Sequence, residues 1–297
     1  MHDSAHDPAA RLRVAMDSGC VAAPGAFNAL TAMAVRSAGF TAAYVSGGAT
    51  SAAAGVPDIG LIDRCDLVQT IREVAAAGGL PVLADADTGF GEEEAAHRTV
   101  IEYVRAGAAG LHLEDQVFPK RCGHLDGKTL IPTEHMVEKL RWARMASDDA
   151  TNGSFIVCGR TDARGVEGLD AAIGRAKAYV EAGAEMIFPE GLSDESEFEA
   201  FAKALDELGD RRPYLLANMT EFGKTPPISL ERFGELGYSI VIYPVTLLRA
   251  AMGAVTRVLE ELQRTGGVGE ATEQMQTREE LYTLLGYRPG QPWSRAR

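Results

Sequence analysis

The sequence lacks several features that would assign it to a class directly. Its 297 residues contain no apolar run long enough to span a bilayer, and the start lacks the basic head and apolar middle of a signal peptide. The four cysteines form no CxxC pair, so neither a disulfide framework nor a structural zinc site is predicted. We therefore expect a cytoplasmic protein with reduced thiols and no membrane partner.

Positive charge is also scarce. The formal net charge is −13, and a surface of that sign repels nucleic acid, which excludes this class of partner. An anionic small molecule would need a local island of positive charge, and residues 120–128 form the densest one. The apolar share of 46% is ordinary for a globular enzyme with an ample core.

The sequence does contain a repeated pattern, in which a helix ends in glycine and a short apolar strand follows. The clearest copies are RSAGFTAAYVSGG, VRAGAAGLHLED, VEAGAEMIFPEG and GELGYSIVIYP. Strands that are apolar on both faces are typical of a buried parallel sheet. Eight candidate strands alternate with helix-sized intervals over residues 20–244, and no GxGxxG follows the first. The pattern predicts an α/β fold of the TIM type, a (β/α)8 barrel, rather than an open doubly wound sheet.

The expected domain organisation is one barrel domain over residues 1–297, with a flexible tail at residues 1–10. A helix from about Thr246 to Gln263 is followed by the flexible stretch TGGVGE and by a helical extension at residues 271–297. A barrel is complete without this extension. We therefore expect it either to cross the barrel mouth or to reach a neighbouring subunit.

Polar side chains end nearly every predicted strand. Catalytic groups of TIM barrels come from the C-terminal ends of the strands, so this regularity indicates a site there. In chain order the residues are Pro24, Ser46, Asp85 with Asp87, Glu114 with Asp115, Arg160 with Asp162, Glu190, Asn218 with Thr220, and Tyr243.

Asp85 and Asp87 lie two residues apart at the third strand end, so both can project to the same face. Converging carboxylates need a proton or a hard cation between them, and oxygen ligands suit Mg²⁺, with Mn²⁺ as a substitute. Glu114 on the next strand is close enough to join. The alternative is that these carboxylates cap the following helices. An EF-hand is excluded, because its position 12 would be Ala96 instead of glutamate.

The stretch YVSGG, Tyr44 to Gly48, places a hydroxyl and glycine amides directly after the second strand. Successive amides form a nest for a carboxylate or phosphate, and a plain turn is the other interpretation. The carboxylates one strand away favour the site.

Cys122 follows the fourth strand, in FPKRCGHLDGK, among the basic residues Lys120, Arg121 and His124. Positive neighbours lower the pKa of a thiol, which suits Cys122 to act as an acid, a base or a nucleophile. Gly123 and a later glycine would let the loop close as a lid. The alternative is an exposed loop tip with a bystander thiol.

Together these motifs resemble the isocitrate lyase and phosphoenolpyruvate mutase superfamily over about residues 10–287. The motifs are YVSGG, DADTGFG, GLHLEDQ, KRCGH, RTDA, FPEG and NMTEFGKTP. KRCGH is similar to the lyases of the superfamily and not to its phosphonate-forming mutases. The resemblance implies an Mg²⁺-dependent carbon–carbon lyase that splits 2-methylisocitrate into pyruvate and succinate, in the methylcitrate cycle of propionate catabolism. It also implies a homotetramer with a swapped helix.

The resemblance further implies roles for single residues. Asp85 and Asp87 would form the metal region, and Glu114 would reach the metal through water. The residues implied to bind substrate or to close around it are Ser46, Gly47, Gly48, Asp58, Lys120, Arg121, Gly123, His124, Arg160, Glu190, Asn218, Thr220, Arg249 and Arg278.

Cleavage of this kind needs a base for the C2 hydroxyl proton, a cation for the developing alkoxide and an acid for the carbanion. Our hypothesis for the base is Tyr44, or a group relayed to it. Cys122 would be the acid, without a covalent intermediate.

The choice of substrate is less sharply indicated. Thr220 and Phe222 in NMTEFG favour a tricarboxylate, whereas LDGK after KRCGH departs from the RPNK that the best-known relatives resemble. The alternatives are a lyase for 2,3-dimethylmalate or another 2-alkylmalate, and a broad-specificity enzyme similar to isocitrate lyase. A non-catalytic carboxylate-binding barrel is disfavoured, because Cys122, the aspartates and Arg160 occur together.

Overall fold

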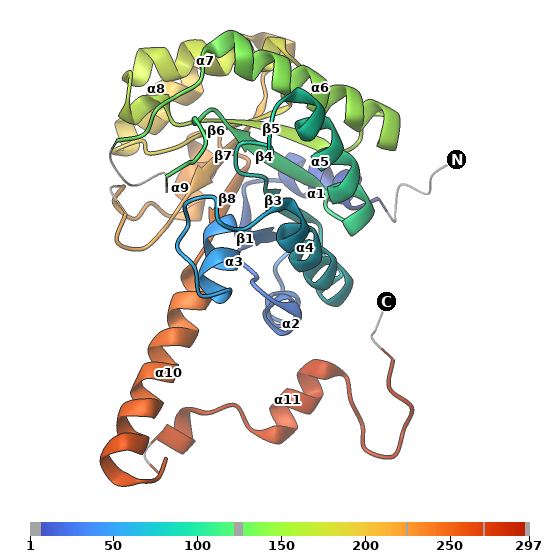
Figure 1. Ribbon diagram of the computed structural model, residues 1–297, viewed down its shortest axis with the longest axis vertical. Coiled ribbons are helices and arrows are strands. Elements are labelled where there is room, and N and C mark those ends of the chain that lie inside the picture. Colours follow the sequence, from blue (N-terminus) through green and yellow to red (C-terminus); the bar gives the residue numbers. More distant parts are fainter. Residues whose placement is uncertain (1–6, 122–126, 224, 270, 295–297) are drawn as a thin grey trace.

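Eight short parallel strands line the centre of the molecule (Figure 1). The computed structural model describes residues 7–121, 127–223, 225–269 and 271–294. Neighbouring strands pair in the order β1-β8-β7-β6-β5-β4-β3-β2. The strands are β1 (Val21–Pro24), β2 (Ala43–Val45), β3 (Val82–Asp85), β4 (Gly110–Glu114), β5 (Ile156–Thr161), β6 (Met186–Pro189), β7 (Tyr214–Asn218) and β8 (Ile240–Tyr243).

The two ends of this strand order meet at a narrow seam. A single bridge pairs Gly25 with Tyr44, and the amide of Ala26 donates a hydrogen bond of 2.8 Å to the carbonyl of Tyr44. These contacts bring β1 beside β2 and make the sheet a nearly closed barrel. The predicted TIM-type fold is confirmed.

Helices cover the outside of the barrel, and glycine ends several of them as the sequence predicts. Gly79 and Gly107 follow their helices in the left-handed conformation, with φ of 63° and 96°. The helices up to β8 are α1 (Pro8–Asp17), α2 (Ala29–Ser37), α3 (Gly47–Ala53), α4 (Arg64–Gly78), α5 (Glu93–Ala106), α6 (Thr133–Thr151), α7 (Leu169–Glu181), α8 (Glu195–Asp206) and α9 (Leu230–Glu235), with short 3-10 turns η1 (Ala163–Gly165) and η2 (Gly209–Arg211).

The core has two parts. One lies between the strands and the outer helices, and the other fills the barrel interior with side chains such as Leu83, Ile156 and Phe188. Leu12 and Met16 of α1 belong to the interior cluster, so α1 closes the N-terminal end of the barrel. The expected tail at residues 1–10 is therefore wrong for residues 8–10, which are helical because α1 has this apolar surface to pack on.

The chain leaves the barrel after β8. Helix α10 (Thr246–Thr265) extends two residues beyond its predicted end and projects away from the barrel (Figure 1). The 3-10 turn η3 (Ala271–Gln274) and helix α11 (Arg278–Leu285) follow, and α11 contacts α2 on the outside of the barrel instead of crossing its mouth. Within the described residues, no helix is both long and apolar enough to cross a membrane.

Candidate active site

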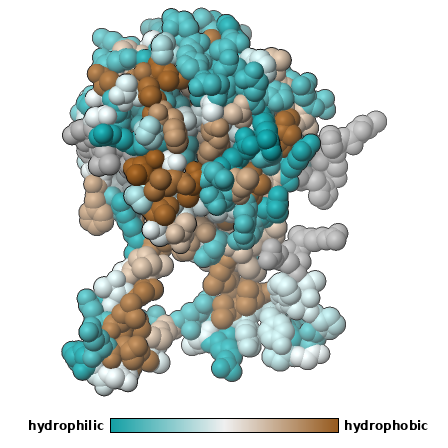
Figure 2. Space-filling view, viewed as in Figure 1, coloured by the Kyte–Doolittle hydropathy of each residue, from teal (hydrophilic) through white to brown (hydrophobic). Residues whose placement is uncertain are grey.

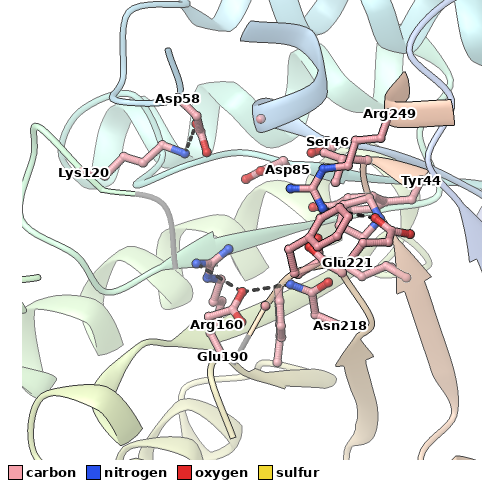
Figure 3. Close-up of a pocket in the computed structure, with 18 residues that line it drawn as sticks. Tyr44, Ser46, Asp58, Asp85, Lys120, Arg160, Glu190, Asn218, Glu221 and Arg249 are labelled. Carbon is pink, nitrogen blue, oxygen red and sulfur yellow. Dashed lines mark hydrogen bonds and ion pairs between the residues drawn. The ribbon is translucent and has the colours of Figure 1, made fainter. Parts of the chain in front are cut away.

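A cavity opens at the C-terminal ends of the strands, where the sequence analysis places the site (Figure 3). The strand ends that carry the site were predicted within a residue, because most of the apolar runs are followed by a polar group. The predicted site residues that line the cavity are Tyr44, Ser46, Gly48, Asp58, Asp85, Lys120, Arg160, Glu190, Asn218, Thr220 and Arg249.

Asp85 is fixed by two backbone amides. Its Oδ2 accepts a hydrogen bond of 3.0 Å from Gly47 at the start of α3, and its Oδ1 accepts one of 3.0 Å from Asp87. Helix α5, which follows β3, has Glu92 at its N-cap position, so Asp85 and Asp87 do not cap it. The helix-cap interpretation is wrong for this pair.

The stretch YVSGG forms the start of helix α3 and not a plain turn. Ser46 caps α3 by accepting a hydrogen bond of 3.2 Å from Ala49. The amide of Gly47 is already used by Asp85, and a side chain at Gly47 would place its Cβ 2.9 Å from Oδ2 of Asp85. Gly47 therefore lets β2 approach β3, and the cavity is lined by Ser46 and Gly48.

Lys120 brings a cation among these carboxylates. Its buried ammonium is paired with Asp58 and forms an ion pair of 2.9 Å with Oδ1 of Asp87. Figure 3 shows Lys120 and Asp58 side by side, joined by their contact. The contact ties the segment before Cys122 to the loop after α3.

Arg160 lies at the centre of a second charged group. Its Nε is 2.9 Å from Oδ2 of Asp162 and 3.2 Å from Oε2 of Glu114, and its Nη2 is 3.4 Å from Oε2 of Glu190. Asn218 donates a hydrogen bond of 3.2 Å to the same Glu190 oxygen (Figure 3). The guanidinium also stacks over Phe188, 5.0 Å from the ring centre. These contacts together hold the guanidinium of Arg160 in one orientation.

The buried carboxylates differ in their proton affinity. Burial alone would raise the pKa of Asp85, but the positive charges of Lys120 and Arg160 and the hydrogen bond from the amide of Asp87 hold it below its usual range. Burial and the charge of Asp85 raise the pKa of Asp87 to about 6. Burial also raises the pKa of Glu114 well above its usual value. The cluster holds more negative charge than its cations balance.

The donor set fits a hard divalent cation. Oδ1 of Asp87 and Oε1 of Glu114 are buried and receive no hydrogen bond from the described residues. Asp85, Asp87 and Glu114 do not bring one oxygen each within 4.8 Å of one another, so a cation here would be held partly through its own waters. Among described residues around the cavity, the acidic groups outnumber the basic ones: Asp58, Asp85, Asp87, Glu114, Asp162, Glu190 and Glu221 against Lys120, Lys128, Arg160 and Arg249.

The sequence analysis missed His112 in β4. Nε2 of His112 lies 2.7 Å from the hydroxyl of Tyr44, and Nδ1 lies 3.7 Å from Oδ1 of Asp85. Burial lowers the pKa of His112 to about 4, so the ring is neutral, and burial with the charge of Asp85 raises the pKa of Tyr44 well above its usual value. The only signal was a histidine inside the apolar run GLHLE.

The opposite rim of the cavity is formed after β7 and at the start of α10. Arg249 is paired with Glu221, and its guanidinium lies 5.4 Å from the ring centre of Phe222 (Figure 3). Phe222 is 98% exposed with a φ of 61°, an uncommon backbone conformation for a bulky residue. Thr220 lines the cavity beside them.

The remaining predicted site residues are Arg121, Cys122, Gly123, His124 and Arg278. Cys122, Gly123 and His124 lie outside the described residues. Arg121 is exposed, and its backbone is held by the side chain of Gln116. The prediction for Arg278 does not hold within one chain, because α11 carries it to the outside of α2.

Two curated relatives match nearly the whole chain. A protein of Corynebacterium glutamicum, named probable 2-methylisocitrate lyase 2, is 50% identical over 264 residues, or 89% of this chain and 83% of the relative. The 2-methylisocitrate lyase of Escherichia coli is 40% identical over 287 residues, or 96% and 94% of the two chains. The model of the phosphoenolpyruvate phosphomutase family matches residues 12–263.

Solved structures show the same fold. A 2,3-dimethylmalate lyase has a TM-score of 0.85 and 35% identity, covering 94% of this chain and 91% of the other. A phosphonopyruvate hydrolase in complex with oxalate and Mg²⁺ has a TM-score of 0.82 and 31% identity, covering 94% and 95%.

Proposed function

The chain belongs to the phosphoenolpyruvate mutase and isocitrate lyase family, and we propose that it cleaves 2-methylisocitrate into pyruvate and succinate. The observation that carries this proposal is the identity of 40–50% to 2-methylisocitrate lyases over most of the chain. The cavity supports it, because carboxylates, a buried arginine and a buried tyrosine converge at the strand ends. We place the reaction in propionate catabolism.

In the reaction, the bond between C2 and C3 of the substrate breaks as the C2 hydroxyl loses its proton. The electrons of the O–H bond form the carbonyl of pyruvate, and the pair from the broken bond stays on the carbon that becomes succinate. We assign the base role to Tyr44 with His112 behind it. The Tyr44 oxygen takes the substrate proton while its own proton passes to Nε2 of His112, 2.7 Å away.

The pKa values of this pair make a proton transfer costly in the empty cavity, because His112 resists protonation and Tyr44 resists ionisation. The alkoxide must therefore be stabilised as it forms. We propose that Asp85 and Asp87 hold Mg²⁺, with Mn²⁺ as a substitute and Glu114 contacting it through water. When bound, the ion supplies a Lewis acid for the developing charge.

The remaining roles go to the basic and polar residues around the cavity. Arg160 offers a fixed guanidinium for a substrate carboxylate, and Glu190 with Asn218 holds it in place. Cys122 is our candidate for the acid that gives succinate its proton. Its position next to Arg121, whose backbone Gln116 anchors, supports this role.

A substrate panel tests the proposed function. Release of pyruvate is measured for 2-methylisocitrate, isocitrate and 2,3-dimethylmalate, with kcat/KM determined side by side. The proposal requires 2-methylisocitrate to have the highest kcat/KM. A preference for 2,3-dimethylmalate would favour the alternative of a 2-alkylmalate lyase, and no pyruvate from any substrate would indicate a non-catalytic barrel.

We also propose that the enzyme is a homotetramer in which α10 packs on a second copy. Four apolar residues of α10 form an exposed stripe at helical spacing: Met252, Val255, Leu259 and Leu262. Figure 2 shows apolar side chains gathered on this projecting leg. An apolar groove on the barrel, between β1, β8 and α2, offers a surface of matching character, with Pro24, Val35, Phe40 and Tyr243 in its lining.

Light scattering tests the assembly. The wild type is expected to have the mass of four chains, and Val255→Asp with Leu259→Asp is expected to dissociate it by placing charge in the contact. A monomeric wild type would contradict the proposal.

The free thiols of Cys20, Cys65 and Cys158 support the companion proposal of a cytoplasmic enzyme.

A further inference from the structure

Two lysines flank the segment that carries Cys122, and each is paired with a carboxylate at the cavity. Lys120, before the segment, contacts Asp58 and Asp87. Lys128, after it, has its Nζ 2.8 Å from Oδ1 of Asp162, and the two side chains are 5% and 0% exposed. The proposed reaction uses neither Lys128 nor Asp162.

Asp162 contacts both Lys128 and Arg160. Its Oδ2 accepts a hydrogen bond of 2.9 Å from Nε of Arg160, and its Oδ1, which faces Lys128, accepts one of 3.3 Å from Nη2. The backbone amide of Asp162 donates a hydrogen bond of 2.9 Å to Oδ1 of Asp115, which holds Asp162 in place at the end of β5. The carboxylate is therefore shared between two cations.

Because Asp162 is also paired with Lys128, it neutralises less of the positive charge of Arg160, and more of that charge can act on a ligand in the cavity. Burial would raise the pKa of Asp162, but Arg160 and Lys128 lower it to about 2, so the carboxylate stays ionised. Without the charge of Lys128, Asp162 would draw the guanidinium of Arg160 toward itself. The contacts of Arg160 with Glu114 and Glu190, now at 3.2 and 3.4 Å, would weaken.

We infer that Lys128 and Asp162 are positioning residues, whose buried ion pair orients Arg160 for a substrate carboxylate. The same pair fastens the chain just after the segment of Cys122 to the strand that carries Arg160. This inference rests on the proposed function, because it assumes that the cavity binds a polycarboxylate.

The test is a double-mutant cycle with Lys128→Met, Asp162→Asn and the combined variant, in the full-length enzyme. Lys128→Met keeps the apolar stem of the side chain and removes the charge. We expect kcat/KM to fall about 100-fold, since a small misplacement of a binding group has effects of this size. The combined variant should lose no more than the worse single variant, because the two residues act through one contact.

Lys128→Arg is the conservative variant, and it should recover most of kcat/KM because it restores a cation opposite Asp162. Lys177→Met is the matched control. It breaks an exposed ion pair of 2.7 Å with Glu207, far from the cavity lining, and should leave kcat/KM unchanged. The midpoint of thermal unfolding is recorded for each variant, and the dissociation constant of succinate is measured by calorimetry as a readout independent of turnover.

The inference is wrong if Lys128→Met lowers the unfolding midpoint but keeps kcat/KM and succinate affinity within about threefold of the wild type, since the ion pair is then only structural. Losses of the single variants that multiply in the combined variant would also overturn it. Failure of the proposed function has a different signature, namely a wild type that does not cleave 2-methylisocitrate. In that case the cycle is read on succinate affinity and on the panel substrate that is cleaved.

Discussion

The two sides of the cavity are built differently. On the buried side, formed by β3 to β5, Asp85, Asp87, Glu114 and Arg160 are each at most 8% exposed and contact neighbouring strands or loops. On the exposed rim, formed after β7 and by α10, the side chains of Glu221 and Arg249 are 35% and 45% exposed and contact mainly each other. The strands therefore hold the residues assigned to the chemical step in fixed positions. Residues of the exposed rim can be substituted with little effect on the stability of the barrel.

The largest effect is expected on the buried side, from Asp85→Asn. The amide oxygen can still accept the hydrogen bond from Gly47, but the charge that would hold a cation is lost. We expect kcat to fall by about 1000-fold or more with little loss of fold. The measurement is kcat across a titration of Mg²⁺, with unfolding midpoints as a control. Wild-type activity that survives exhaustive dialysis against EDTA would contradict the metal assignment.

Cys122→Ser extends the comparison to the segment attached to the buried side. A hydroxyl is a much weaker acid than a positively flanked thiol, so we expect kcat to fall by about 100-fold or more. Affinity for succinate should stay near the wild-type value, since the cysteine acts only on the carbanion. A variant that keeps the wild-type kcat would remove the cysteine from the mechanism.

Gly47→Ala disturbs the buried side without removing a charge. The new Cβ would lie 2.9 Å from Oδ2 of Asp85 and 3.3 Å from Oδ1 of Asp87, so both carboxylates must shift. We expect kcat/KM to fall about tenfold, in line with the cost of overpacking a tight site. Gly174→Ala in α7 is the control, because no atom lies within 4 Å of its added Cβ. Activity of the control should be unchanged, and its unfolding free energy should rise by about 1 kcal/mol. Equal activity of both variants would refute the crowding argument.

Phe222→Asn addresses the exposed rim and should have the smallest effect. Asparagine tolerates the left-handed backbone of this position, and the contact with Arg249 contributes only about 1 kcal/mol. We expect kcat to be preserved and the ratio of kcat/KM between 2-methylisocitrate and 2,3-dimethylmalate to change by about threefold. Kinetics with both substrates provide the measurement. A 100-fold loss of kcat would show that the rim takes part in the chemical step.

Much of the frame could be predicted because its signals are local. β3 ends at Asp85, β7 at Asn218 and β8 at Tyr243, each where an apolar run meets a polar residue. The same logic does not tell which way a strand-end side chain points. Asp115 turns away from the cavity to bind Thr161 and Tyr179 under the helices, although it follows Glu114 directly.

The missed features depend on contacts between distant parts of the chain. His112 matters because it meets Tyr44 across the barrel interior, and no spacing rule pairs β2 with β4. Helix α1 forms because the barrel offers its apolar residues a surface at one end. Arg278 was assigned to the site by resemblance, but the path of α10 carries it away from the cavity of its own chain.

The seam between β1 and β2 limits which sequences this fold accepts. A Cβ at Gly25 would stand 2.1 Å from the carbonyl oxygen of Pro244, so any other residue there would push the end of β8 aside. Pro244 and Val245 line the cavity, so the displaced backbone would reshape it, although Gly25 is not itself among the lining residues. Substitutions of Gly25 should therefore lower activity as substitutions of a catalytic residue do, although glycine carries no reactive group.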